Sequence, residues 1–202
     1  MKKIIYFAIV SLVVFMLSGC ASSTPQVKRV SLDEIPDYSW RWGENDNRIV
    51  SEQITMEMLS SPWLPSFREE EGRKPVLIVG TIRNLSSEHI ETQSFVKTIE
   101  TQITNSGKVK LVASRTERKE IRDERMEQQN YASDETAKAL ARETGADIML
   151  QGSIKSTRDT KGGKSVITYQ VDMELINLET NEKLWMGSVP ISKIDSPAKA
   201  KW

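Results

Sequence analysis

The sequence of 202 residues contains one cysteine and one histidine, the side-chain types that most often serve as nucleophile and general base. His89 stands in a polar segment, and no Gly-x-Ser-x-Gly turn surrounds any serine, so a Ser–His–Asp site has no local support. A zinc site of the usual kind needs three or four Cys or His ligands, which the chain does not supply. We therefore expect no catalytic residue, no metal site and no cofactor, and a protein that is not an enzyme.

Two further patterns could suggest chemistry. Lys161-Gly-Gly-Lys-Ser165 resembles part of a phosphate loop, but such a loop joins a strand to a helix, whereas this segment joins two predicted strands. We interpret it as a hairpin turn. Among the 28 acidic residues, two carboxylates could act as acid and base on a glycan. Asp172 and Glu174 look like solvated side chains, so a glycan hydrolase stays a minor alternative that predicts activity on purified sacculi without another protein.

The cysteine has a different context. Residues 1–3 are Met-Lys-Lys, and residues 4–17 form an apolar run that is broken only by Ser11. This pattern is typical of a secretory signal peptide and is too short to span a bilayer comfortably. The ending Leu17-Ser18-Gly19-Cys20 resembles the lipobox of bacterial lipoproteins, in which the signal is cleaved before the cysteine. The resemblance implies a signal peptide over residues 1–19 and a mature N-terminus at Cys20 carrying acyl chains such as palmitate.

Location and charge follow from the same segment. Ala21 replaces the Asp that retains many lipoproteins in the inner membrane, so we expect lipid anchoring at the outer membrane, facing the periplasm. Loss of residues 1–19 leaves 26 basic and 28 acidic side chains, a net charge of −2. This balance argues against a nucleic-acid partner, and no polybasic segment points to anionic lipid. Since Cys20 is the only cysteine, no intramolecular disulfide can form.

We expect a tether over residues 20–45, a globular domain over residues 46–195 and a loose tail over residues 196–202. The first part of the tether is rich in small, polar and Pro residues. Its aromatic residues Tyr38, Trp40 and Trp42 have two interpretations. The favoured one is that they dock on the domain and begin it early; the other is an exposed aromatic patch for a partner.

Four helices are expected from apolar spacing. The first runs to about residue 60, is capped by Asn45 or Asp46, and is ended by Pro62 and Pro65. The others cover about residues 91–105, 115–127 and 133–144. The helix over 115–127 is crowded with charge of both signs, which favours a solvated surface helix over a docking site for a charged partner.

Five strands are expected, over residues 76–79, 109–112, 147–155, 165–178 and 183–191, with a polar loop over 83–89. The uninterrupted apolar run at 76–79 predicts a central strand that is covered on both faces, with the N-terminal helix as the natural second cover. The last three strands are sequential and alternate, so one of their faces should be open to water. The fold class is therefore a mixed α+β/α/β domain: one mixed sheet with an antiparallel C-terminal meander, flanked by helices.

Two stretches together resemble a known family. Residues 74–90 (KPVLIVGTIRNLSSEHI) lead into the second helix and residues 106–112 (SGKVKLV), and residues 139–154 read ALARETGADIMLQGSI. Over about residues 46–193 the chain is similar to the LpoB-type lipoproteins that activate penicillin-binding proteins, and more distantly to the curli-secretion lipoprotein CsgG. The resemblance implies a protein that binds a periplasmic domain of a bifunctional penicillin-binding protein, activates peptidoglycan synthesis and so influences cell shape, without a small-molecule substrate.

One departure concerns the tether. Tethers of the LpoB type are long and Pro-rich, whereas this tether holds only Pro25 and Pro36. Either the envelope is more compact or the partner differs. A CsgG-like secretion channel or another envelope-assembly role is the alternative function; a channel needs membrane-crossing hairpins, and only the strand over 165–178 has the length.

The candidate partner-binding residues lie on the uncovered polar side of the predicted sheet, with an ordinary hydrated face as the alternative. They are Gln151, Ser153, Lys155, Thr168, Gln170, Asp172 and Glu174.

Overall fold

The computed structural model describes residues 39–129 and 145–195, which fall within one unit of the chain, Pro36–Trp202. Cys20, most of the predicted tether, the predicted helix over residues 133–144 and the predicted tail lie outside the described residues. Within the described ranges, no helix has the length and apolarity that a membrane span requires.

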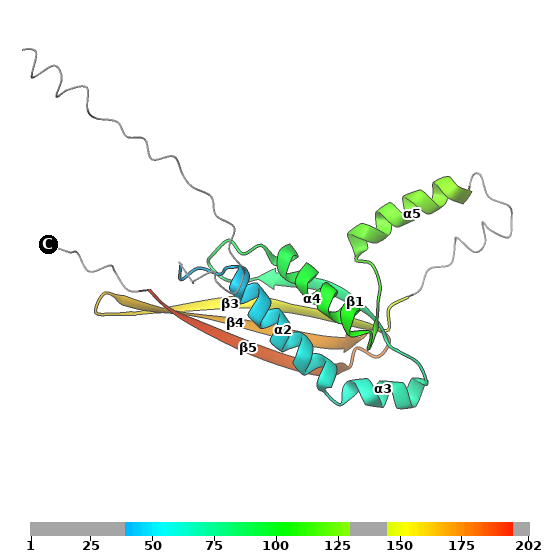
Figure 1. The fold of residues 1–202 in the computed structure, drawn as a ribbon, viewed down its shortest axis with the longest axis horizontal. Coiled ribbons are helices and arrows are strands. Elements are labelled where there is room, and N and C mark those ends of the chain that lie inside the picture. The colour runs from blue at the N-terminus through cyan, green and yellow to red at the C-terminus, as the bar shows by residue number, and fades with distance from the viewer. Residues whose placement is uncertain (1–38, 130–144, 196–202) are drawn as a thin grey trace, which may run out of the picture. The chain divides into compact units, whose positions relative to one another are not determined.

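One five-stranded sheet organises these residues, in the order β2-β1-β3-β4-β5 (Figure 1). β1 (Val76–Asn84) runs parallel to β2 (Lys110–Leu111) and to β3 (Ile148–Lys161). β3, β4 (Lys164–Asn177) and β5 (Lys183–Asp195) form an antiparallel meander. The mixed sheet and the C-terminal meander are thus confirmed.

The strands are longer than the sequence patterns indicated. β1 continues through the first residues of the predicted polar loop to Asn84. β3 and β4 pair as far as Lys161 and Lys164, because the turn between them consists of only Gly162 and Gly163 at φ of 59° and 77°. A left-handed two-residue turn matches the twist of a hairpin and requires glycine-like residues. All three meander strands have 13 or 14 residues, so the expectation that only one strand was long is wrong.

Four helices are present in the described ranges: α2 (Glu44–Ser60), α3 (Trp63–Glu71), α4 (Thr92–Ser106) and α5 (Arg115–Gln129). α3 was not predicted. Pro62 ends α2, as expected, but it is also the N-cap of α3, and Pro65 lies in the first turn, where a missing N–H costs no helical hydrogen bond. The predicted cap of α2 is also wrong. Gly43 is the N-cap, and its N–H donates to Oδ2 of Asp46 at 2.8 Å.

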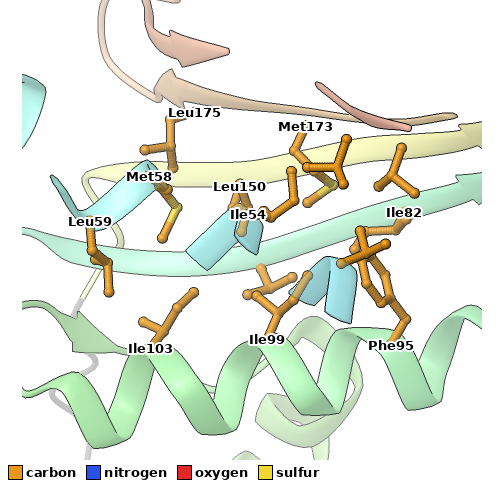
Figure 2. Close-up of a cluster of buried hydrophobic side chains, with 14 of the residues drawn as sticks. Ile54, Met58, Leu59, Ile82, Phe95, Ile99, Ile103, Leu150, Met173 and Leu175 are labelled. Carbon is orange, nitrogen blue, oxygen red and sulfur yellow. The ribbon is translucent and has the colours of Figure 1, made fainter. Parts of the chain in front are cut away.

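The core lies between α2, α4 and one face of the sheet (Figure 2). Every fourth residue of each helix faces it, and all six are 0% exposed: Val50, Ile54 and Met58 of α2 and Phe95, Ile99 and Ile103 of α4. β4 contributes every second residue, from Ile167 to Leu175. Residues four apart in the two helices and residues two apart in β4 therefore pack together in one apolar layer.

The expected position of the N-terminal helix is wrong. α2 packs beside α4 on the same face of the sheet, and its Ser51 Oγ accepts a hydrogen bond from Gln102 of α4 at 3.2 Å. The opposite face of β1 is nevertheless closed, since Val76 and Ile78 are only 6% and 5% exposed. β1 is thus buried on both faces, as its apolar run predicted, but α2 is not the second cover.

A short segment before α2, residues 40–43, packs against the core, and we name it the N-terminal strap. The Trp42 ring makes edge contacts with Phe95 and Tyr169, at centroid distances of 6.2 and 5.4 Å. Its indole N–H donates to Oδ1 of Asn47 at 2.7 Å, and Trp40 also packs on the core. The favoured interpretation of Trp40 and Trp42, docking on the domain, is confirmed.

Candidate functional site

The face of the sheet opposite α2 and α4 is polar over the middle of β3 and β4, and we name it the outer face. Cross-strand pairing arranges it in rows. One row joins Arg83, Ser153, Asp172 and Ser188, and the next joins Gln151, Glu174 and Met186. A hollow of about 850 Å³ lies on this face and spans four strands. The side chains around it come from β1, β3, β4 and β5: Thr81, Arg83, Gln151, Ser153, Lys155, Asp172, Glu174, Met186 and Ser188.

The structure brings five of the seven predicted partner-binding residues together around this hollow: Gln151, Ser153, Lys155, Asp172 and Glu174. The other two lie farther along β4. Gln170 still belongs to the same hydrogen-bond network, because its amide donates to Oδ1 of Asp172 at 2.8 Å. Thr168 does not; its hydroxyl lies 2.9 Å from that of Ser192, away from the hollow.

The two carboxylates of the hollow are both held by protein donors. Asp172 accepts from Lys155 at 2.8 Å and from Ser188 at 2.8 Å, and the bond from Lys155 is the main reason that its pKa is lowered. Glu174 accepts from Lys183 at 2.6 Å and from Gln151 at 2.8 Å, and these bonds lower its pKa as well. At neutral pH both groups are therefore charged and fixed in place.

Sequence reasoning missed four residues of the hollow. Thr81 was assigned to no element, because the predicted strand ended at residue 79, and Arg83 was assigned to a polar loop. In the structure β1 continues through both and shifts register between Val79 and Ile82, and the extra residue is a bulge that turns the following side chains. Met186 and Ser188 belong to β5, for which no face was assigned. The alternation of β5 could have placed them on the polar side, because Met173 and Val171 of β4 pair with Gly187 and Val189.

The other residues with possible chemistry are not gathered around this hollow. His89 is exposed in the loop between β1 and α4. Gly162 and Gly163 form the tip of the β3–β4 hairpin, as the sequence predicted. In the described ranges, no group of three or more His, Cys, Asp or Glu could hold a metal ion.

A buried ion pair fastens the N-terminal strap. Lys193 of β5 is 9% exposed and its Nζ donates to Oδ2 of Asp46 at 2.6 Å and to the Arg41 carbonyl at 3.1 Å. Nearby, the Tyr169 hydroxyl lies 2.7 Å from both carboxylate oxygens of Glu88 and 3.2 Å from the Trp40 carbonyl. Burial, and then the bond to Glu88, raise the pKa of Tyr169. The strap is therefore held by polar bonds at both tryptophans.

The Gly-Ala-Asp and Gly-Ser motifs of residues 145–153 have structural roles. Asp147 accepts two bonds from Arg73, at 2.7 and 2.9 Å, and one from the Val76 backbone N–H at 2.8 Å. It thereby joins the starts of the parallel strands β1 and β3. A Cβ atom on Gly152 would lie 2.3 Å from both the Asp172 carbonyl oxygen and the Met173 sulfur, so only glycine fits. Both motifs secure the sheet that presents the hollow.

Comparison with protein families gives a match over most of the chain. The model described as "Peptidoglycan-synthase activator LpoB" matches residues 46–191 of this chain. This range includes most of α2, all of α3 to α5 and β1 to β4, and most of β5. No curated protein matches the chain.

Solved structures that match this chain include two LpoB C-terminal domains and one lipoprotein. The LpoB C-terminal domain from Escherichia coli is 19% identical, with 66% of this chain and 100% of that chain covered and a TM-score of 0.37. The corresponding domain from Salmonella enterica is 19% identical, with coverages of 64% and 93% and a TM-score of 0.36. Lipoprotein GNA1162 from Neisseria meningitidis is 17% identical, with coverages of 61% and 88% and a TM-score of 0.40.

Proposed function

Because this chain belongs to the LpoB family of peptidoglycan-synthase activators, we propose that it binds a periplasmic domain of a bifunctional penicillin-binding protein and stimulates peptidoglycan synthesis. The observation that carries the proposal is the family match over residues 46–191. The protein makes and breaks no bonds itself in this proposal. It acts by binding the active conformation of the synthase more tightly than the inactive one, since only a difference in affinity can shift that equilibrium.

The outer face is our proposed site of contact. Its carboxylates, amides and lysines are hydrogen-bonded to one another across β3, β4 and β5, so they lose little conformational freedom when a partner covers them. The hollow also gives this face a shape that a protruding segment of a partner can enter. If this face were only an ordinary hydrated surface, filling the hollow with a bulky side chain would not change the affinity for the synthase.

We further propose that acyl chains on Cys20 anchor the protein at the outer membrane, facing the periplasm. The lipobox-like ending at Cys20 and the Ala at position 21 support this location. Two or three acyl chains hold a protein far more durably than one, because each buried methylene contributes about 0.8 kcal/mol. The residues between Cys20 and the strap then limit the distance at which the synthase can be reached.

The test of function uses the mature lipoprotein in detergent. Affinity purification from envelope extracts, followed by mass spectrometry, identifies the retained synthase, and glycan polymerisation and cross-linking by that synthase are then measured with and without the lipoprotein. We expect saturable stimulation of both activities. Absence of every penicillin-binding protein from the retained partners would refute the proposal. Hydrolysis of purified sacculi by the lipoprotein, with no other protein present, would instead indicate an enzyme.

Two matched substitutions test the proposed face. Ser188→Tyr fills the hollow from β5, whereas Ser66→Tyr adds the same side chain at an exposed position of α3. We expect the first variant to lose binding to the synthase and the second to keep it. Equal binding by both variants would exclude the outer face as the interface.

Anchoring is tested separately. Cys20→Ala removes the proposed acylation site, and we expect the variant to leave the outer-membrane fraction. The intact mass of the wild-type protein should exceed that of the polypeptide from residue 20 by the acyl groups. An unmodified mass for the membrane-bound protein would contradict the lipid anchor.

A further inference from the structure

The charges around the hollow do not cancel once Lys183, which lies outside the lining but pairs with Glu174, is counted. Asp172 is paired with Lys155 at 2.8 Å, and Glu174 is paired with Lys183 at 2.6 Å. Each carboxylate is therefore neutralised by a lysine from within the protein. Arg83 is the remaining charged residue at the rim, and it leaves one positive charge in excess.

Arg83 is available for a partner. Its side chain is exposed, and it makes no hydrogen bond or ion pair with any other described residue. The guanidinium lies close enough to Glu174 to help lower the pKa of that carboxyl, but Gln151 and Lys183 hold the carboxylate oxygens. An arginine offers a planar pair of N–H donors that matches a carboxylate, so this position suits an acidic side chain.

The side of the hollow formed by β5 carries one exposed apolar side chain, Met186. Met186 of β5 is 66% exposed, although its cross-strand neighbour is the charged Glu174. Methionine is flexible and adapts its shape to different apolar surfaces, which makes it common at binding faces. An exposed methionine in a polar hollow is thus a position where an apolar side chain of a partner can be buried.

We propose that the outer face binds an extended acidic segment of the partner protein, with Arg83 pairing with a carboxylate and Met186 covering an apolar side chain. This inference rests on the proposed function and specifies the chemistry of the segment that is bound. Charge complementarity favours an acidic segment, because an incoming cation would find both carboxylates already occupied. A paired charge gains strength once the partner excludes water from it.

The spacing of the two anchors restricts the segment further. Arg83 and Met186 are three strands apart, which corresponds to about 14 Å at about 4.8 Å per strand, and they lie in neighbouring rows, which adds an offset of about 7 Å along β5. The two positions are therefore roughly 16 Å apart. An extended chain advances about 3.3 Å per residue, and alternate side chains share a face. A segment that crosses the strands obliquely therefore places the acid and the apolar residue about four to six positions apart.

The experiment measures the Kd between the full mature lipoprotein in detergent and the synthase that the wild type retains. The variants are Arg83→Glu, Met186→Ser and, as a control, Lys164→Glu, which reverses an exposed charge at the far end of β4. We expect Arg83→Glu to weaken binding at least about tenfold, with a smaller salt dependence than the wild type. Met186→Ser should weaken it less, and Lys164→Glu should leave it unchanged. A synthase variant in which the matching acidic residue is replaced by lysine should bind the Arg83→Glu lipoprotein again.

The outcomes separate this inference from the function. If the wild type retains no synthase, the proposed function fails. If the wild type binds and activates a synthase but Arg83→Glu binds equally well, the function stands and the acidic segment is refuted. An equal loss for Arg83→Glu and Lys164→Glu also refutes it, because general electrostatic attraction then explains the binding.

Discussion

Removal of one partner from the buried Asp46–Lys193 pair should strongly destabilise the domain. Asp46→Asn keeps the shape of the side chain and a carbonyl oxygen but removes the negative charge. Lys193, 9% exposed, then faces a neutral amide oxygen where the carboxylate was, beside the Arg41 carbonyl. Because Asp46 is 2% exposed, water cannot readily replace the lost charge.

The magnitude follows from the geometry. At 2.6 Å, two unit charges attract each other by about 6 kcal/mol at an effective dielectric constant of about 20. Part of this attraction only offsets the cost of burying both ions, and removal of one partner of such a pair typically costs about 3–5 kcal/mol. We expect Asp46→Asn to lower the free energy of unfolding by about 3 kcal/mol.

The double variant distinguishes a charge effect from a packing effect. Lys193→Met removes the cation whose carboxylate partner has been lost, so Asp46→Asn with Lys193→Met should regain most of the loss. The assay is urea unfolding of the mature protein, followed by circular dichroism and by tryptophan fluorescence, which also reports the strap through Trp42. A loss below about 1 kcal/mol for Asp46→Asn, or strictly additive losses in the double variant, would refute the reasoning.

Two further predictions concern the motif at the start of β3. Gly152→Ala should lower the unfolding free energy by about 1–3 kcal/mol, because the added Cβ meets atoms of β4 at 2.3 Å. Gly145→Ala is the matched control, since no atom lies within 4 Å of its Cβ, and a comparable loss there would contradict the steric explanation. Asp147 has a pKa below its ordinary value, mainly through its bonds from Arg73. Its stabilisation is therefore present above the unfolded-state pKa of about 4 and is lost as the pH falls. Asp147→Asn should flatten the fall in unfolding free energy between pH 5 and 3; an unchanged slope would show that other carboxylates cause it.

Much of the fold could be predicted from local patterns. The apolar spacing in α4 and the alternation in β4 each repeat several times, and Gly162-Gly163 permits only a tight turn between two strands. Each of these patterns depends only on residues that are close together in the sequence, so it can be recognised without the folded structure. The prediction failed where one residue served two elements, as Pro62 does at the junction of α2 and α3.

The candidate site was predicted in part for the same reason. Alternation along β3 and β4 is a local property, and it placed Gln151, Asp172 and Glu174 on one polar face. Arg83 was missed because the strand was expected to end at residue 79 and Arg83 was assigned to the loop that follows it. The bulge within β1 and the continuation of β1 to Asn84 depend on the pairing partner. Sequence reasoning could assign no face to a residue whose register was not yet known.

By itself, the sequence determined the apolar periods, the hairpin turn, the scarcity of nucleophiles and metal ligands, and the lipobox-like segment, because each depends on residue types and short spacings. Only the tertiary structure decided which side of the sheet α2 covers and why Lys193 stands at an inward position of β5. Its partner Asp46 lies 147 residues away. A buried charge is explained by the group that neutralises it, and that group is found only when the chain is folded.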